Sequence, residues 1–291
     1  MKKEEKKSIG SFDELDFNYF PCTKEIFKNF INTKKVILYI ALVVFLLLIT
    51  SNNYYFAILI FIFSLLYVFL NLERERRKLL GDFISNNNLS YQDSIPMKEV
   101  KGNLFKTNYS AKIKDVINGK YQEHDARFFY FTYTVQQGKN TIVYDFTVLE
   151  VFFDKVIFPY MHLLYGNRFG FFSNFPKHGK REGNKREVRL EDEFAKNFKL
   201  FVKDGYGIEA MQLFSKEFLN FLIDEKCDFS IELNQDRMYI YKRYRIGKKE
   251  ELKEMFETAN QTIKKINPLL DRLGNDFSIL KDAYSKKYDK K

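Results

Sequence analysis

KKVILYIALVVFLLLITSNNYYFAILIFIFSLLYVFLNLERERRK, residues 34–78, determines how the rest of the chain is arranged. This stretch contains two uncharged apolar runs, Val36 to Ile49 and Tyr54 to Leu70, which are separated by Thr50-Ser51-Asn52-Asn53. The second run has the length that a helix needs to cross a hydrocarbon core of about 30 Å, and the first is somewhat shorter. The pattern predicts a transmembrane hairpin of two helices.

Two other interpretations fit this stretch less well. The core of a soluble protein rarely needs two uninterrupted apolar runs separated by only four polar residues. A cleavable signal peptide would carry a small-x-small cleavage site after its apolar run, and none follows Thr50. The membrane hairpin therefore remains the favoured interpretation.

The charged flanks predict the orientation of the hairpin, because basic residues stay on the cytoplasmic side of a membrane. The connecting turn carries no charge. We expect a protein of the cell membrane with two spans and both termini in the cytoplasm. No Asp, Glu, Lys, Arg or His lies within either span, which favours an anchor over a transporter. The residues expected at the membrane interface are Lys34, Lys35, Arg74, Arg76, Arg77 and Lys78.

The chain of 291 residues carries a net charge of +10, and these flanks contribute +4 through six basic and two acidic residues. Roughly 220 residues follow the hairpin, which is enough for one good-sized domain. Cys22 and Cys227 have no CxxC partner, which favours reduced thiols in the cytoplasm. The expected division is an N-terminal cytoplasmic segment (1–33), the transmembrane hairpin (34–72), a membrane-proximal helix and linker (73–100), an α+β cytoplasmic domain (101–246) and a C-terminal helical segment (247–291).

The period of the apolar residues changes toward two after the linker. Phe129, Phe131, Tyr133 and Val135 alternate along one run, and residues 136–140 form a candidate hairpin turn before a second apolar run, 141–153. Residues 229–240 repeat this pattern around Asn234-Gln235-Asp236. We therefore expect an antiparallel sheet.

Helical spacing appears in two segments of the domain. Apolar residues predict one amphipathic helix over about 206–224, and a second from Leu252 that is stopped by Pro268. These helices are expected to pack on the sheet or on a partner. The predicted fold class is α+β, with a two-helix transmembrane hairpin followed by an antiparallel-sheet cytoplasmic domain with amphipathic helices. Residues 1–20 are either a disordered leader or a short docking peptide.

The interval KHGKREGNKREVR, residues 177–189, is the most polar part of the domain. It is either a solvated surface loop or a contact for anionic lipid headgroups, which attract suitably placed basic residues. Nucleic acid is not an expected partner, because no nucleic-acid-binding module accompanies the charge. The candidate anionic-lipid contacts are Lys177, Lys180, Arg181, Lys185, Arg186 and Arg189.

The sequence contains no nucleophile elbow, phosphate loop or dinucleotide fingerprint, and its three histidines have no metal-ligand spacing. We assign no catalytic residue, metal or cofactor. The densest polar cluster contains His124, Asp125 and Arg127, which are candidate ligand contacts because they combine proton exchange with anion binding. A plain strand-turn-strand connection is the alternative, because neighbouring strand residues point to opposite faces.

The chain resembles a family of uncharacterised bacterial two-pass membrane proteins with a cytoplasmic domain of unknown function. The resemblance lies in the hairpin and in GKYQEHDARFFYFTYTV (119–135), EFAKNFKLFV (193–202) and FSIELNQDRMYIY (229–241). It supplies no catalytic residues.

The leading hypothesis is therefore a membrane-anchored cytoplasmic interaction or scaffold protein that contacts membrane lipid and binds another protein or a second copy of itself. The alternatives are a membrane-proximal enzyme or ligand-binding domain, and an anionic-lipid sensor.

Overall fold

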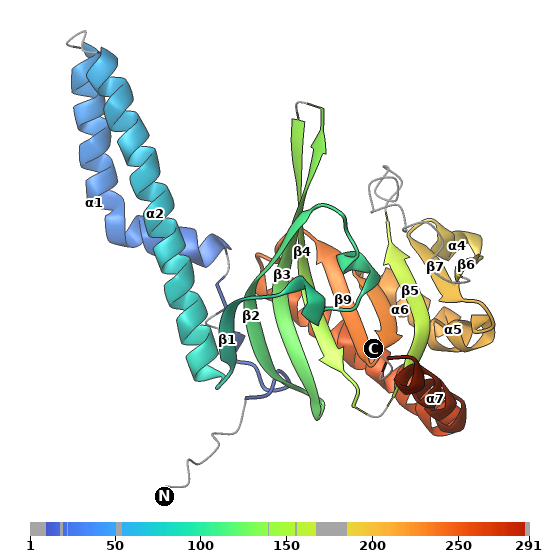
Figure 1. The fold of residues 1–291 in the computed structure, drawn as a ribbon. Coiled ribbons are helices and arrows are strands. Elements are labelled where there is room, and N and C mark those ends of the chain that lie inside the picture. The colour runs from blue at the N-terminus through green and yellow to red at the C-terminus, as the bar shows by residue number, and fades with distance from the viewer. Residues whose placement is uncertain are drawn as a thin grey trace, which may run out of the picture. The chain divides into compact units, whose positions relative to one another are not determined.

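The computed structural model describes residues 10–17, 20–21, 23–50, 54–138, 140–154, 156–166 and 185–288 (Figure 1). The chain divides into two compact units. A helical unit contains Glu14–Asn88 together with Ile246–Glu251, and a sheet unit contains the other described residues. Each unit is described by itself below.

Two long helices make up most of the helical unit. The helices α1 (Thr23–Thr50) and α2 (Tyr54–Asn86) lie side by side, and the ring centroids of Phe45 and Phe61 are 5.9 Å apart (Figure 1). Among the described helices, α2 is the one that is long and apolar enough to cross a membrane. The structure thus shows one candidate span where the sequence predicts two, and the apolar part of α1 is the shorter of the two runs.

The helix α2 continues well beyond its apolar run, as its sequence predicts. Glu73 accepts hydrogen bonds from Arg76 and Arg77 on the following turn. The helix ends at Asn86, and the next residue, Asn87, donates from its side-chain amide to the Phe83 carbonyl over 2.8 Å. Arg74, Arg77 and Lys78 are exposed along this extension, and the side chains of Lys34 and Lys35 lie outside the described set.

Nine antiparallel strands form one sheet in the order β1-β2-β3-β4-β9-β8-β5-β7-β6, so the α+β class is confirmed. The strand β1 lies within 73–100, a segment for which a helix and a linker were expected. The strands are β1 (Ser90–Ile95), β2 (Ser110–Tyr121), β3 (His124–Gln137), β4 (Asn140–Phe152), β5 (Phe158–Tyr165), β6 (Lys185–Val188), β7 (Phe198–Lys203), β8 (Ser230–Gln235) and β9 (Arg237–Arg243).

One face of the sheet is covered by residues 96–105, which we call the strap. The strap holds two short 3-10 helices, η2 (Met97–Glu99) and η3 (Asn103–Phe105). The ring of Phe105 packs 5.0 Å from that of Phe131 and 5.3 Å from that of Tyr239. This strap face therefore has its own apolar core.

The opposite face, which we call the helix face, is covered by helices. The helices α6 (Lys216–Asp224) and α7 (Lys249–Tyr288) lie behind the sheet in Figure 1. The ring of Phe256 on α7 lies 5.5 Å from that of Tyr121 on β2, and its carbonyl accepts a 2.6 Å hydrogen bond from the Tyr121 hydroxyl. Two covered faces explain why the central strands are aromatic on both sides.

Two helix predictions were wrong in their boundaries. The predicted helix over 206–224 is divided into α5 (Gly207–Leu213) and α6, because Ser215 caps the second helix by accepting from the Phe218 N–H over 3.4 Å. The helix α7 runs through Pro268 to Tyr288, so that proline does not end it. An interior proline costs one backbone hydrogen bond, and α7 tolerates this loss.

The N-terminal segment Gly10–Asp13 docks on the sheet rather than forming a free leader. The Lys120 N–H donates to the Gly10 carbonyl over 3.0 Å, and the Phe12 N–H donates to the Lys120 carbonyl over 2.5 Å. Phe12 is 3% exposed and stacks on Phe256. These contacts favour the docking-peptide interpretation for this segment.

Candidate functional site

A row of polar side chains crosses the strap face of the sheet. Arg127 on β3 is directly opposite Glu150 on β4, which is opposite Tyr239 on β9. Tyr239 is in turn opposite Glu232 on β8, and Glu232 is opposite His162 on β5. Directly opposed residues project to the same face, so the five side chains form one line, which we call the polar row. Apart from Arg127, each of them is fully buried.

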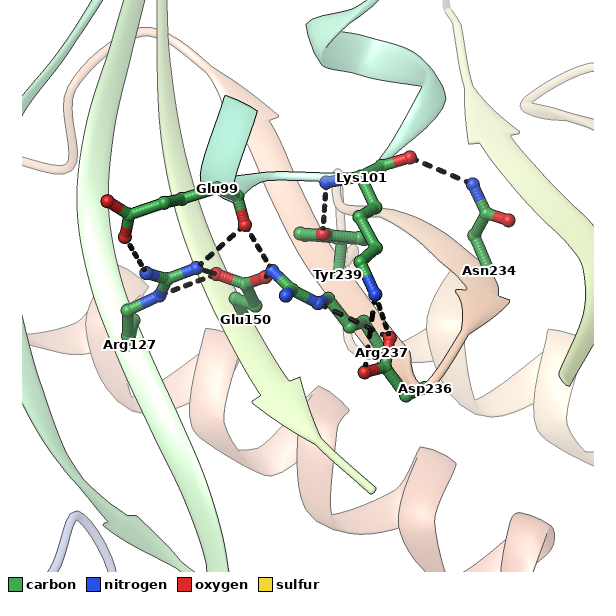
Figure 2. Close-up of polar contacts among 8 residues, drawn as sticks. All are labelled: Glu99, Lys101, Arg127, Glu150, Asn234, Asp236, Arg237 and Tyr239. Atoms are coloured by element: carbon green, nitrogen blue, oxygen red, sulfur yellow. Dashed lines mark hydrogen bonds and ion pairs between the residues drawn. The ribbon is translucent and has the colours of Figure 1, made fainter. Parts of the chain in front are cut away.

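The carboxylate of Glu150 is held between two arginines (Figure 2). The Arg127 Nε donates to Glu150 Oε2 over 2.8 Å, and the Arg237 guanidinium donates to Glu150 Oε1 over 2.5 Å. Both guanidinium groups also lie over the ring of Phe152, at 4.9 and 4.7 Å from its centroid. Burial lowers the pKa of Arg237, but Glu150, Tyr239 and Asp236 together outweigh burial and raise that pKa. The Arg237 guanidinium therefore stays charged in this position.

The polar row also fixes the backbone of the strap. The carbonyl of Glu99 accepts hydrogen bonds from Arg127 and Arg237, and the Lys101 N–H donates to the Tyr239 hydroxyl over 2.9 Å (Figure 2). The Asn234 side-chain amide donates to the Lys101 carbonyl over 3.0 Å. These side chains make hydrogen bonds to the strap backbone that a neighbouring strand would make within a sheet.

Glu232 joins the same face to the strap farther along the row. Its Oε1 accepts a 2.6 Å hydrogen bond from the Asn103 N–H, while its Oε2 has no partner among the described residues. Burial raises the pKa of this carboxyl to about 7, although the N–H groups of Asn103 and Leu104 act in the opposite direction. Glu232 can therefore exchange a proton near neutral pH, in a position that is covered by the strap.

His162 lies at the end of the row, between two tyrosine hydroxyls. Its Nε2 is 2.6 Å from the Tyr241 hydroxyl, and its Nδ1 is 3.0 Å from the Tyr160 hydroxyl. Burial raises the pKa of both tyrosines, so these hydroxyls stay protonated. One ring nitrogen of His162 can accept from a hydroxyl while the other donates, which satisfies the imidazole inside the protein.

The structure does not bring the predicted set His124, Asp125 and Arg127 together. His124 projects to the helix face, where its ring lies 4.4 Å from that of Phe153. Asp125 is exposed and lies 3.8 Å from the Lys120 ammonium group. Arg127 belongs to the polar row on the strap face. The alternation of side chains along β3 separates His124 from its two neighbours.

The sequence did not identify the other members of the row as site residues. Their signal is a charged residue inside an otherwise apolar strand: Glu150 stands between Leu149 and Val151, and Glu232 between Ile231 and Leu233. Which basic residues meet them depends on strand pairing, which the sequence alone does not give.

The predicted lipid contacts are only partly described. Lys177, Lys180 and Arg181 lie outside the described residues. The Lys185 ammonium group lies 3.9 Å from the ring centroid of Tyr160 and contacts the Asn103 side chain. Arg186 and Arg189 line a groove.

This groove, of about 550 Å³, lies between β6 and α5. We call it the β6–α5 groove. Its volume is in the range of small-molecule sites. Its lining residues are Arg186, Glu187, Val188, Arg189, Gly207, Ile208, Met211 and Gln212. Among the described residues, no cluster of three His, Cys, Asp or Glu side chains is placed to hold a metal ion.

Comparisons with known proteins assign no family to the chain. No protein-family model matches it, and no curated protein matches it. A crystal structure of the mycobacterial trehalose monomycolate transport factor A, TtfA, is similar with a TM-score of 0.41 and 12% sequence identity. The similarity covers 66% of this chain and 92% of that chain. A likeness at this level carries no inference about function.

Proposed function

We propose that this protein is a membrane-anchored interaction protein, with α1 and α2 as its anchor and the sheet unit as a cytoplasmic scaffold domain. The observation that carries the proposal is the apolar surface of α2. Twelve of its large apolar side chains are exposed, among them Tyr55 at 90% and Phe69 at 69%. Soluble monomers rarely expose a contiguous apolar patch of this kind.

The size of this surface makes a membrane the favoured environment. Fully burying a large apolar side chain contributes roughly 1.5–3 kcal/mol, so covering the twelve exposed side chains contributes on the order of 20 kcal/mol. That gain exceeds the whole folding stability of an ordinary domain, which is about 5–15 kcal/mol. A lipid bilayer covers the uncharged run of α2, residues 54–72, whose length matches a hydrocarbon core of about 30 Å.

The second span in this proposal is α1. It too exposes large apolar side chains, including Tyr39 at 69% and Leu46 at 53%. Its uncharged run is short for a full crossing, and Lys34 and Lys35 can reach the interface by snorkelling. Basic residues at the outer ends of the two apolar runs favour a cytoplasmic location for both termini. Membership of the bacterial two-pass family that the sequence resembles is part of the same proposal.

The scaffold role is supported by the charge balance among the six charged side chains that Figure 2 shows between the sheet and the strap. Arg127, Arg237 and Lys101 supply three positive charges, and Glu99, Glu150 and Asp236 supply three negative charges. The charges of this network therefore cancel, and its contacts hold the strap against the sheet. A rigid, internally neutralised domain on a membrane anchor suits the binding of another protein or of a second copy.

Crosslinking at native expression level tests the interaction. Membranes are treated with an amine-reactive crosslinker, solubilised in mild detergent and purified through a tag on the chain. We expect a discrete crosslinked species, either a homo-oligomer or a complex with one protein. A matched sample with the crosslinker omitted sets the background. Recovery of the monomer alone would contradict the interaction role.

Sensing of anionic lipid is a second candidate function, because two of the basic residues predicted for it, Arg186 and Arg189, line the β6–α5 groove.

A further inference from the structure

The β6–α5 groove combines basic and apolar side chains in one concave surface. Arg186 lies on the edge strand β6, Arg189 follows the end of that strand, and both side chains are exposed. Ile208 and Met211 come from α5 and are 74% and 40% exposed. Val188 lies on β6 between the two arginines. This isoleucine is three-quarters exposed and lies beside a second exposed apolar side chain and two guanidinium groups. Such a combination is unusual on a surface that contacts only water.

Gly207 gives Arg186 its place in this groove. A side-chain carbon at position 207 would lie 2.6 Å from a terminal guanidinium nitrogen of Arg186. The absence of that carbon lets the guanidinium rest against the start of α5. Arg186 makes no ion pair in the part of the chain that the structure describes, so its charge remains available to a ligand.

The charge of the groove is positive on balance. Glu187 is the one acidic residue that lines it, and the Lys199 ammonium group lies 3.9 Å from that carboxylate. A ligand with a negative group therefore meets Arg186 with little competition from Glu187. Guanidinium groups hold phosphate oxygens in a bidentate manner, while Ile208 and Met211 offer an apolar surface to hydrocarbon.

We propose that the β6–α5 groove binds an anionic phospholipid of the bilayer, with its phosphate on Arg186 and Arg189 and the start of an acyl chain on Ile208 and Met211. The inference rests on the proposed membrane anchor. Leu89, the first residue of the sheet unit after the anchor, follows the end of α2 by three residues, so the proposed anchor would keep the sheet unit as a whole at a lipid surface.

The chain has no tryptophan, which allows a direct test. The Ile208→Trp variant of the full chain carries its single indole in the groove. Its fluorescence is measured in nonionic-detergent micelles that contain equal fractions of brominated phosphatidylglycerol or brominated phosphatidylcholine, because bromine quenches an indole in contact with the lipid. We expect stronger quenching by the anionic lipid, with a preference that weakens as salt is added. Val143→Trp places the indole on the β3–β4 hairpin instead and is expected to show no preference.

Charge variants in the same background locate the interaction. Arg186→Gln and Arg189→Gln are each expected to weaken the apparent binding of the anionic lipid by about fivefold. Gly207→Ala should also weaken binding, because it displaces the Arg186 guanidinium without a change of charge. Lys216→Gln is the matched control, since it removes a positive charge from an exposed position on α6 that does not line the groove.

Equal quenching by the two lipids would overturn the proposal. So would a loss of binding in Lys216→Gln equal to that in the arginine variants. A third contrary result is quenching that is abolished by a polyglutamate peptide which itself binds more tightly than the lipid. The last result would identify a site for acidic peptides. Because this assay uses mixed micelles, it does not require the helices to cross a bilayer. Its failure would therefore leave the proposed anchor intact.

Discussion

Replacing Glu150 by glutamine tests whether the polar row stabilises the sheet unit. Glu150 is fully buried, and the side chains of Arg127 and Arg237 are 12% exposed. The amide keeps the shape of the side chain but removes the charge between two arginines. Breaking a buried pair by loss of one partner typically costs about 3–5 kcal/mol, because a buried charge is left without compensation.

The cost of Glu150→Gln should fall in this range. For a unit of this size, each kcal/mol lowers the melting temperature by roughly 2–4 °C, so we expect a decrease of about 6–20 °C. Near-UV circular dichroism of the full chain in detergent follows the melting, since the sheet unit is rich in buried tyrosine and phenylalanine.

Two further variants separate this explanation from a general effect of mutation. Asp125→Asn is the matched control, because its carboxylate is exposed and forms a 3.8 Å pair with exposed Lys120, so its loss should cost less than about 1 kcal/mol. The triple variant Arg127→Met, Glu150→Leu, Arg237→Met removes all three charges and should be more stable than Glu150→Gln. A decrease below 2 °C for Glu150→Gln would refute the reasoning.

Two other predictions concern the strap and the N-terminal segment. The pKa of Glu232 is raised from 4.5 to about 7 in the folded protein, so the folded state binds an extra proton between these values, and stability should fall by roughly 3 kcal/mol as pH rises through this window. Glu232→Gln should flatten the plot of denaturant midpoint against pH within this window. An unchanged plot would exclude Glu232 as the cause. In Gly119→Ala the new carbon would lie 2.7 Å from Leu89 and 2.9 Å from Phe12, so we expect a loss of about 1–3 kcal/mol and faster proteolysis near Gly10. Gly81→Ala on α2 is the control, because a side-chain carbon at position 81 would have no neighbour within 4 Å. Equal cleavage of the two variants would count against docking of the N-terminal segment.

Local patterns predicted a large part of the fold. Alternating aromatic residues identified β3, alternating apolar residues identified β8 and β9, and the turns at 136–140 and 234–236 separate the observed strand pairs. The helix break at Ser215 was missed because Met211, Phe214 and Phe218 keep a helical spacing across it, so the apolar pattern hides the cap. The continuation of α7 through Pro268 was missed because a proline is a strong but not absolute stop signal.

The polar row and the contact that Arg237 makes with it could not be predicted in the same way. Arg127, Glu150 and Arg237 are spread over more than a hundred residues, and they meet only because β3, β4 and β9 are adjacent in one register. A one-residue shift in that register would place Glu150 on the other face. His124 and Arg127 are close in the sequence, but the alternation of side chains along β3 places them on opposite faces of the sheet.

The orientation of both chain ends tests the central claim, the two-span anchor, most directly. The full chain carries one epitope tag at each end. One membrane sample is extracted with alkaline carbonate, and in separate samples protease is added to intact cells and to sealed inverted membrane vesicles. The account predicts that the chain stays in the membrane pellet, that both tags survive in cells, and that both are digested in inverted vesicles. Release by carbonate would contradict the anchor, and protection of one tag with digestion of the other would contradict two spans.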